Sequence, residues 1–555
     1  MEILLKVKIL VAEVFKKHGL EQGRLPIVQR TNRFSLGDLF VPNGPFTKEK
    51  NEDFEKLLQN IKELFISKNI PITKVTSNDF SRVAMFLDRA HFYHSVIDCV
   101  MNQKDEYGMV KSGDRRTILL VNDSRKLYDE KNSLNTLRSV IVHETAGKLL
   151  TANGFEVKSQ FSRSEIKVIS CFQSEISFDI DTEICTSAKC GSDNAQLQEL
   201  YEMIYRCRYV SELMSEEGSL EPAGDGMPRW LQFDLRQFIT DNGLKAGSGH
   251  FDKNLHKCAI LENGVPTSAL QNAAKNFILI KTGGMKTAVH IVDQSEAFNQ
   301  QKVVLLIQQL ALLTTTKLTQ CWQVIGPVIV KQGGKELGQS ADKFIRLTYA
   351  QLRQAAIMKY GETVHGEGWS GNLKALTTAC VKFHLLSCVP RNQLKLSFSD
   401  DMREDGTYVS TGSFVMYNCA RLIMLFAHFQ QAVDNGTFPP LPELEKIDFS
   451  TLREEQEWSL LLTYVFTFPD LVQQTIQNME PSDTTTLNIH THKMCQMLGS
   501  LSRCLSSYYS RYHVLGEARP HLYPQMFARL YLLKAVHQVL VNGLQLIAVS
   551  PLSQV

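Results

Sequence analysis

The sequence predicts an α/β body that is preceded by an α+β domain and followed by an all-helical tail. A β-α-β pattern occupies residues 116–160 and returns from residue 276, and such alternation is typical of a parallel sheet. From about residue 408 to the end, apolar residues recur every three or four positions, as they do on amphipathic helices. We therefore expect three parts, at residues 1–112, 113–400 and 401–555.

The composition fits a globular chain of several domains. Its 555 residues correspond to about three or four domains, and hydrophobic (43%) and charged (21%) residues have ordinary shares. The formal net charge of +2 excludes neither a nucleic-acid partner nor a protein partner. Only a local basic patch would favour nucleic acid.

The sequence carries no clear targeting, membrane or metal signal. The N-terminus is interrupted by charges and lacks a small-residue cleavage site, and no run approaches the ~18 apolar residues of a membrane span. The 12 cysteines include no C-x-x-C pair, which favours reduced thiols in a cytoplasmic protein. The nearest approaches to metal-ligand spacing lie in polar, irregular sequence, so we expect no metal and no cofactor; they are Cys185 with Cys190, and His250 with His256 and Cys258.

The first part combines helix and strand patterns. Apolar residues between Ile3 and Phe15 follow a helical spacing. After polar linkers, SRVAMFLDRAHFYHSVIDCVM (81–101) begins like a strand and continues as an amphipathic helix.

The body begins with TILLVND (117–123), a short apolar run that predicts a buried strand. A helix follows in SLNTLRSVIVHETAGKLLTANGFEV (133–157), with Gly154 as its stop and a strand after it. Residues 161–258 are predicted to be an irregular insertion with one helical stretch near 197–214.

The second half of the body repeats the alternation. We expect strands at NFILI (276–280), AVHIVD (288–293) and CWQVIGPVIV (321–330), with a helix at 297–313. Residues 333–348 are predicted to form a turn-rich loop.

The tail predicts a helical bundle. Four segments have helical apolar spacing, and Asn542–Gly543 is interpreted as the end of the last helix; the segments are 414–433, 457–476, 492–515 and 527–549.

The tail also carries the most specific motifs of the chain. In order and spacing it resembles the DALR anticodon-binding domain of arginyl-tRNA synthetases; the matching pieces are TGSFVMYNCARL (411–422), LLLTYVFTFPDLV (460–472), residues 492–517 and residues 528–552. Three further segments are similar to the N-terminal add-on domain and the Rossmann-like class I body of those enzymes, at 84–97, 136–157 and 288–304. The resemblance therefore implies an N-terminal add-on domain, a class I synthetase body and a DALR domain.

The body differs from this family at the positions of the ATP-binding signatures. The positions of the His-x-Gly-His signature, whose histidines stabilise ATP phosphates, are Ser133, Leu134, Asn135 and Thr136. SRKL (124–127) replaces an upstream signature element, and the loop that supplies basic and hydroxyl residues to the triphosphate here carries Gly338, Gln339 and Ser340. Since each such contact is worth roughly 3–4 kcal/mol, we expect a degenerate body that does not activate an amino acid.

A DALR tail on a degenerate body is similar to a vertebrate group of non-catalytic synthetase relatives. This resemblance implies an accessory factor that binds arginine tRNA and assists a tRNA 3-methylcytidine methyltransferase, with no membrane and no DNA partner. Two alternatives stay open: a divergent arginyl-tRNA synthetase that uses other residues, and a protein-interaction scaffold that binds no RNA.

A local basic bias in the tail predicts where tRNA would bind. Six basic residues and one acidic residue lie between Lys493 and Lys534, and aromatic residues with arginine suit unstacked anticodon bases. The predicted contacts are Tyr417, Arg421, Tyr508, Tyr509, Arg511, His513, Arg529 and Lys534.

Each of these positions also has a structural interpretation. Some of the tyrosines can belong to the core, Tyr417 and Arg421 can pack the tail on the body, and Arg529 and Lys534 can be ordinary solvated charges. His143 and Glu144 on the predicted body helix are interpreted as surface polarity rather than as an acid–base pair. FDIDTE (178–183) is interpreted as an exposed strand or loop.

Overall fold

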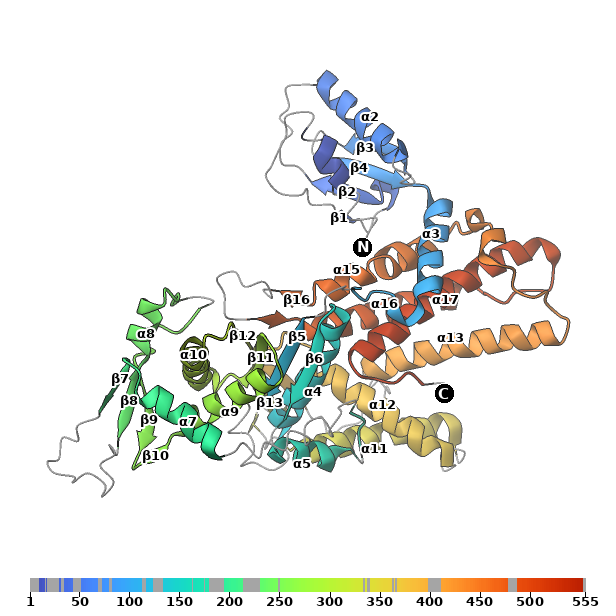
Figure 1. Cartoon of the computed structure of the whole chain (residues 1–555). Helices are drawn as coiled ribbons and strands as arrows, with labels where there is room; N and C mark the ends of the chain where they lie inside the picture. The colour runs from blue at the N-terminus through green and yellow to red at the C-terminus, as the bar shows by residue number, and fades with distance from the viewer. Residues whose placement is uncertain are drawn as a thin grey trace.

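The fold was analysed in a computed structural model of the chain (Figure 1). The structure describes residues 9–14, 16, 29–30, 34–42, 51–67, 72–78, 82–111, 116–122, 133–161, 163–173, 175–178, 194–212, 230–247, 250–332, 335–336, 340–361, 364, 367–397, 411–477 and 487–552. Residues 124–127, 179–193, Gly338 and Gln339, on which several sequence predictions fall, lie outside these ranges.

The N-terminal domain is an antiparallel sheet with helices around it. Its four strands have the order β1-β2-β4-β3. They are β1 (Gln29–Arg30), β2 (Leu39–Pro42), β3 (Ile72–Asn78) and β4 (Arg82–Leu87), with η1 (Phe34–Leu36) before β2 and α2 (Asn51–Ser67) before β3. As predicted, β4 runs into a helix, α3 (Arg89–Gln103), which η2 (Lys104–Glu106) follows. Figure 1 shows α3 leaving the domain and lying along the tail helices.

A parallel sheet forms the centre of the body. Its four strands have the order β12-β11-β5-β6, and all neighbours pair in parallel. The sheet and its main helices are β5 (Thr117–Asn122), α4 (Leu134–Ala152), β6 (Glu156–Gln160), β11 (Thr287–Asp293), α10 (Ala297–Leu313) and β12 (Thr319–Ile325). The predicted α/β class and the first β-α-β unit are therefore confirmed.

The predicted irregular insertion is more regular than expected. Much of its described part forms a second, antiparallel sheet with the order β10-β9-β8-β7. The elements are α5 (Arg163–Phe172), α7 (Asn194–Tyr205), β7 (Val210–Glu212), β8 (Leu231–Asp234), α8 (Leu235–Asp241), β9 (Lys257–Glu262) and β10 (Val265–Pro266). These strands are short and separated by polar stretches, which hid them from a search for periodicity.

The strand predicted at NFILI is wrong. Residues 276–280 are the second half of a helix, α9 (Ser268–Thr282). Leu270, Ala273, Phe277 and Ile280 are buried on its inner face at helical spacing. A five-residue apolar run does not distinguish a buried strand from a buried helix, and here the preceding alanines were the better guide.

CWQVIGPVIV is two strands rather than one. The chain leaves β12 after Ile325, turns at Gly326–Pro327 and enters β13 (Val328–Gln332). This strand pairs with β14 (Lys335–Glu336) and β15 (Leu394–Ser397) in a separate small sheet. Proline cannot donate to a sheet ladder, so it marks the break.

The loop predicted at 333–348 is also wrong from residue 341 onward. A long helix, α11 (Ala341–Tyr360), begins there with Ser340 as its N-cap, because the Ser340 hydroxyl accepts a hydrogen bond from the Lys343 amide. A second long helix, α12 (Glu367–Leu385), packs against α11 and against the first tail helix.

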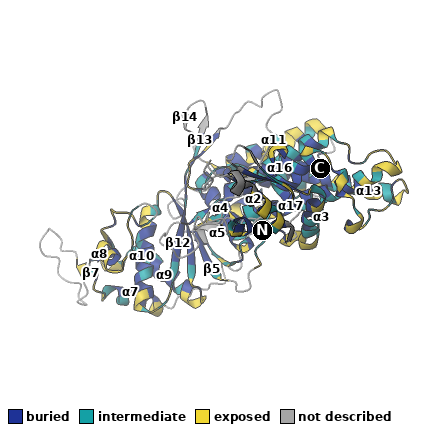
Figure 2. Cartoon of the chain, turned by 90° about the horizontal axis from the view of Figure 1, so that it is seen from above, coloured by how far each residue is buried: buried dark blue, intermediate teal, exposed yellow. Residues whose placement is uncertain are grey.

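The tail is a helical bundle, as predicted. Its elements are α13 (Thr411–Asp434), η5 (Leu444–Lys446), η6 (Phe449–Thr451), α14 (Glu455–Ser459), the π-helical stretch η7 (Leu460–Val465), α15 (Phe468–Gln473), β16 (Ile476–Gln477), β17 (Asn488–Ile489), α16 (Thr491–Arg511), η8 (Pro520–Leu522) and α17 (Tyr523–Leu546). Figure 2 shows buried residues running through this bundle into the body. Among the described helices, none has both the length and the apolar character needed to cross a membrane.

Asn542–Gly543 is not a helix end, because α17 continues to Leu546. The Asn542 side chain is buried and donates to the carbonyl oxygens of Lys104 (2.9 Å) and Tyr107 (3.0 Å). A Cβ on Gly543 would lie 2.7 Å from Leu498, so the glycine allows α16 and α17 to approach closely. The pair is therefore structural, but for a different reason from the one predicted.

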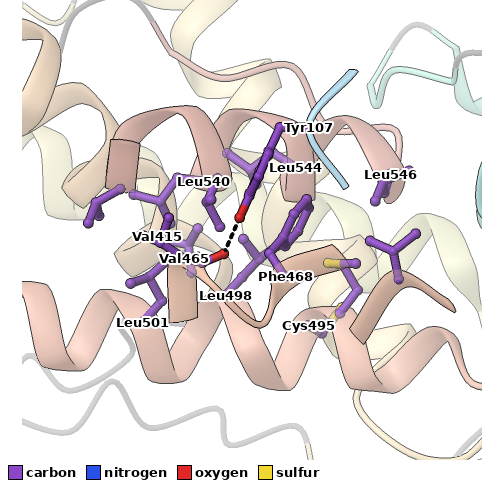
Figure 3. Packing of buried hydrophobic residues seen from close by; sticks show 14 of the residues in the cluster. Tyr107, Val415, Val465, Phe468, Cys495, Leu498, Leu501, Leu540, Leu544 and Leu546 are labelled. Carbon is purple, nitrogen blue, oxygen red and sulfur yellow. Dashed lines mark hydrogen bonds between the residues drawn. The ribbon is translucent and has the colours of Figure 1, made fainter. Parts of the chain in front are cut away.

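Two buried hydrogen bonds join the tail to the N-terminal part. The Tyr107 hydroxyl donates to the Val465 carbonyl at 2.9 Å within the apolar core of the bundle (Figure 3). In the N-terminal domain, the buried Asp38 carboxylate accepts from the Trp458 indole at 2.7 Å. These buried polar contacts fix the position of the tail against a part that is distant in sequence.

The segment before α16 lies along the free edge of the body sheet. The Leu487 amide donates to the Trp322 carbonyl at 3.0 Å, and the Ile489 amide donates to the side-chain oxygen of Gln323 at 2.7 Å. Both acceptors belong to β12, the outermost strand of that sheet.

Candidate nucleic-acid interface

The two altered signature elements of the body meet in space. Ser133 and Ser340 are more than two hundred positions apart, yet they form an isolated antiparallel bridge. Each is the N-cap of a long helix: the Ser133 hydroxyl accepts from the Thr136 amide, and the Ser340 hydroxyl accepts from the Lys343 amide. The starts of α4 and α11 therefore lie side by side, and the assignment of both stretches to one phosphate site stays a prediction.

The residues at the start of α4 are packed in the interior or bonded to neighbouring segments of the body. Leu134 and Thr136 are buried, and the Asn135 side-chain oxygen accepts from the Val328 amide at 2.7 Å. Arg138, one turn further along α4, is also buried and donates to the carbonyl oxygens of Gly326 (2.6 Å) and Asn392 (3.1 Å). Asn135, at one of the signature positions, and Arg138, which follows them, thus tie α4 to the start of β13 and to the loop at Asn392.

The interpretation of His143 and Glu144 as surface polarity is wrong, because both residues are buried. The reason is that α4 packs against several elements and has few exposed positions. The Glu144 carboxylate lies 2.7 Å from the ammonium group of Lys382 on α12. Lys382 also donates to the Ala548 carbonyl at 2.6 Å, so this ion pair joins two body helices to the C-terminal end of the tail.

His143 makes the protein sensitive to acid. Its ring lies 4.1 Å from the Phe161 ring, and burial lowers its pKa to about 3. Because the folded-state pKa lies below the unfolded value of about 6.5, its contribution is fully present above pH 6.5 and is lost as the pH falls toward 3. At pH 5 the expected loss in the free energy of unfolding is about 2 kcal/mol.

Replacing His143 by leucine is therefore expected to flatten the decline of the denaturation midpoint between pH 7 and pH 5. Urea denaturation at both pH values measures this. An unchanged pH dependence in the His143→Leu variant would show that other groups cause the decline.

In the tail, the structure brings together three of the predicted contact residues. Arg421 on α13 donates to the Tyr417 hydroxyl at 3.0 Å. Its guanidinium lies 4.8 Å from the Tyr417 ring and 4.8 Å from the Tyr509 ring of α16. All three side chains are partly exposed. We call this arrangement, an arginine between two tyrosine rings, the tail ladder.

The tail ladder combines what a single-stranded nucleic acid requires. Aromatic rings with accessible surface stack on bases, and the guanidinium both reads planar groups and neutralises phosphates. Among the described residues, no carboxylate lies within salt-bridge distance of Arg421, so its charge is available.

Two of the predicted contacts belong to the core instead. Tyr508 has no exposed surface, and its hydroxyl donates to the Glu457 carboxylate at 3.1 Å. Burial raises the pKa of Tyr508 well above its ordinary range, so the hydroxyl stays protonated as a donor. Arg529 is 9% exposed and is paired with the same carboxylate at 2.8 Å. Tyr508 is therefore closed to solvent, and Arg529 is nearly so.

Sequence reasoning missed Glu457, the residue that draws both side chains inward. It is the last of three glutamates in REEQE (453–457) and directly precedes the apolar run WSLLL, where a buried carboxylate needs partners. That position was the available signal.

The remaining predicted contacts are dispersed. Arg511 and His513 are exposed at and just after the end of α16. Lys534 on α17 is partly buried and lies 5.5 Å from the Tyr531 ring, and burial lowers its pKa. All three side chains have surface that solvent can reach, and their role in tRNA binding stays a prediction.

One cation that the sequence analysis did not single out extends the tail ladder. The ammonium group of Lys359, at the end of α11, lies 5.0 Å from the Tyr417 ring.

The described residues contain no group of three or more histidine, cysteine, aspartate or glutamate side chains that could hold a metal ion. Cys258 is buried in β9, and burial raises its pKa to about 11, which disfavours the thiolate that binds metals. Cys185 and Cys190 lie outside the part of the chain that the structure describes.

Comparisons with known proteins match both the tail and the whole chain. The family described as the DALR anticodon binding domain matches residues 415–555. The chain is 32% identical to DALR anticodon-binding domain-containing protein 3 of Mus musculus over 438 residues, covering 76% of this chain and 75% of that protein. The protein of the same name from Danio rerio is 30% identical over 426 residues, covering 76% and 74%.

Among solved structures, the fold is similar to that of arginyl-tRNA synthetase from Thermus thermophilus. The TM-score is 0.62 at 14% sequence identity, and the alignment covers 99% of each chain. This similarity confirms the predicted architecture of an add-on domain, a class I synthetase-like body and a helical DALR domain.

Proposed function

Because the chain belongs to the family of DALR anticodon-binding domain-containing protein 3, we propose that it is a non-catalytic adaptor that binds arginine tRNA through its tail. The body is then a scaffold that keeps the synthetase fold without its adenylation chemistry. The finer part of the proposal is that the adaptor presents this tRNA to a tRNA 3-methylcytidine methyltransferase.

One contrast carries the proposal. The tail ladder of Tyr417, Arg421 and Tyr509 leaves a cation and two rings accessible. In the body, by comparison, Ser133 is bridged to Ser340, and Ser133, Leu134 and Thr136 are buried. The nucleic-acid surface of the fold has been kept, whereas the described residues of its nucleotide site now serve packing.

Arginine tRNA is the proposed ligand because the solved structure with the same architecture is an arginyl-tRNA synthetase. The methyltransferase partner is supported by the resemblance to non-catalytic synthetase relatives. Recognition of a single cytidine does not distinguish one tRNA from another. An adaptor of this kind would supply that specificity by binding particular tRNAs.

One measurement on the purified protein tests whether it is non-catalytic. Arginine-dependent exchange between ATP and pyrophosphate is expected to stay at background, because several contacts of roughly 3–4 kcal/mol each are missing. Robust exchange would instead identify a divergent synthetase.

Crosslinking in cells followed by RNA sequencing tests the ligand. Arginine tRNAs are expected to be enriched over other tRNAs. Recovery of no tRNA above background would favour the alternative of a protein scaffold without RNA.

The methyltransferase part is tested separately. Cells that lack this protein are expected to lose 3-methylcytidine from arginine tRNAs, and affinity purification is expected to recover the methyltransferase. Unchanged methylation of arginine tRNAs would contradict this part and leave tRNA binding standing.

A further inference from the structure

The alternation of cations and aromatic rings in the tail ladder continues into the body at Lys359. Lys359 lies over two rings at once: its ammonium group is 5.0 Å from the Tyr417 ring of the tail and 4.7 Å from the Tyr360 ring at the end of α11. The order Tyr509, Arg421, Tyr417, Lys359 and Tyr360 therefore crosses the boundary between tail and body.

A second aromatic pair lies beyond Lys359. The Tyr360 ring is 5.1 Å from the Trp369 ring of α12, with 48° between the planes. Both rings are partly exposed. Both also pack against a small buried cluster of Ala356, Val364 and Leu373. We call this pair the body platform. Because the cluster supports it, the platform presents aromatic surface in a fixed position.

The two cations of this line, Lys359 and Arg421, form no salt bridge within the part of the chain that the structure describes. Among the described residues, Arg353, Lys359 and Arg421 have no carboxylate within the 4.0 Å of a salt bridge. Other cations nearby do have such partners: Arg346 pairs with Glu175, and Lys382 pairs with Glu144. The charges of Lys359 and Arg421 are therefore available to phosphate groups directly beside the rings that these cations contact.

We propose that the body platform of Tyr360 and Trp369, together with Lys359, is a second stacking site for single-stranded RNA that continues the tail ladder across the body–tail boundary. This inference rests on the proposed tRNA binding and extends it to residues of the body. The body then takes part in recognition instead of serving only as a scaffold.

Single-stranded RNA fits this surface better than a duplex. Stacking needs bases that are free of their neighbours, whereas an RNA duplex offers mainly phosphates and 2′-hydroxyl groups. Rings alternating with unpaired cations are the arrangement that tracks successive bases and phosphates of a single strand. The loop of a tRNA anticodon arm supplies such a strand.

Intrinsic fluorescence isolates the platform, because the chain has only four tryptophans. Trp322 and Trp458 are buried, which leaves Trp369 and Trp230 with exposed surface. Titration of the full chain with an unmodified anticodon arm of an arginine tRNA is expected to quench tryptophan fluorescence. The Trp369→Phe variant is expected to lose this quenching, whereas Trp230→Phe is expected to keep it.

Affinity supplies an independent readout. Replacing the exposed Lys359 by alanine is expected to weaken binding of the same RNA about fivefold. The matched control is Lys343→Ala, an exposed lysine about 24 Å away along the same helix, which is expected to change affinity less than twofold.

The outcomes separate the two proposals. If the unaltered protein does not bind the anticodon arm, the proposed function fails. If it binds with Tyr417- and Arg421-dependent affinity, but Trp369→Phe keeps the quenching and Lys359→Ala binds normally, only the body platform is excluded.

Discussion

Replacing Lys382 by methionine is expected to lower the free energy of unfolding by about 3–5 kcal/mol. The Lys382 ammonium and the Glu144 carboxylate are 2.7 Å apart, with side chains 0% and 1% exposed. Methionine fills the volume but leaves the carboxylate in the interior without its cation. The Ala548 carbonyl loses its donor as well, so the tail end is expected to loosen from the body.

A double variant distinguishes the free-energy cost of the unpaired buried carboxylate from the cost of altered packing. Glu144→Leu combined with Lys382→Met removes both charges and is expected to recover most of the lost stability. Lys374→Met, on the same helix but only partly buried, is the matched control and is expected to cost less than about 1 kcal/mol. Thermal and urea denaturation measure all three, and an equal loss for Lys374→Met would contradict the role of the ion pair.

Replacing Arg421 and Tyr509 together by alanine is expected to weaken arginine tRNA binding by a factor of about 50, roughly 2–3 kcal/mol. The double substitution removes the central cation of the tail ladder and one of the two rings that flank it. Both side chains are partly exposed, so the bundle is expected to stay folded. Equilibrium binding to a full-length transcript measures the effect, and circular dichroism checks the fold.

Arg503→Ala is the matched control for this variant. Arg503 is exposed on α16 and bonds only to the neighbouring Ser500 hydroxyl among the described residues. Its loss is expected to change affinity less than about twofold. Equal binding by the Arg421/Tyr509 variant and the unaltered protein would place the tRNA on another surface, for example around Arg511 and His513.

The adjacent residues Tyr508 and Tyr509 illustrate what sequence reasoning could not decide. Both are tyrosines in one family motif at one helix end, and both were predicted to bind tRNA. The choice between them depends on the rotation of α16 against its neighbours, which places Tyr508 on Glu457 and Tyr509 on Arg421. That rotation follows from tertiary packing and has no local signal.

The architecture was more predictable than the site. Periods of two and of three to four residues are local properties, so the β-α-β unit and the tail bundle could be predicted from their own segments. The failures at NFILI and at residues 341–348 concern segments whose state is decided by what packs on them. The junction of Ser133 with Ser340 was inferred only through resemblance, because no local pattern links residues so distant in sequence.

Leu487 and Ile489 of the tail bond to β12 of the body sheet, and this contact limits where the chain can be truncated. With Leu487 removed, the Trp322 carbonyl of the outermost body strand would lose its donor, and an uncovered strand edge recruits other strands and leads to aggregation. Truncation products that end before the tail are therefore expected to be insoluble. Fragment studies should keep the tail attached, and a premature stop codon in the corresponding gene would remove the body's function along with that of the tail.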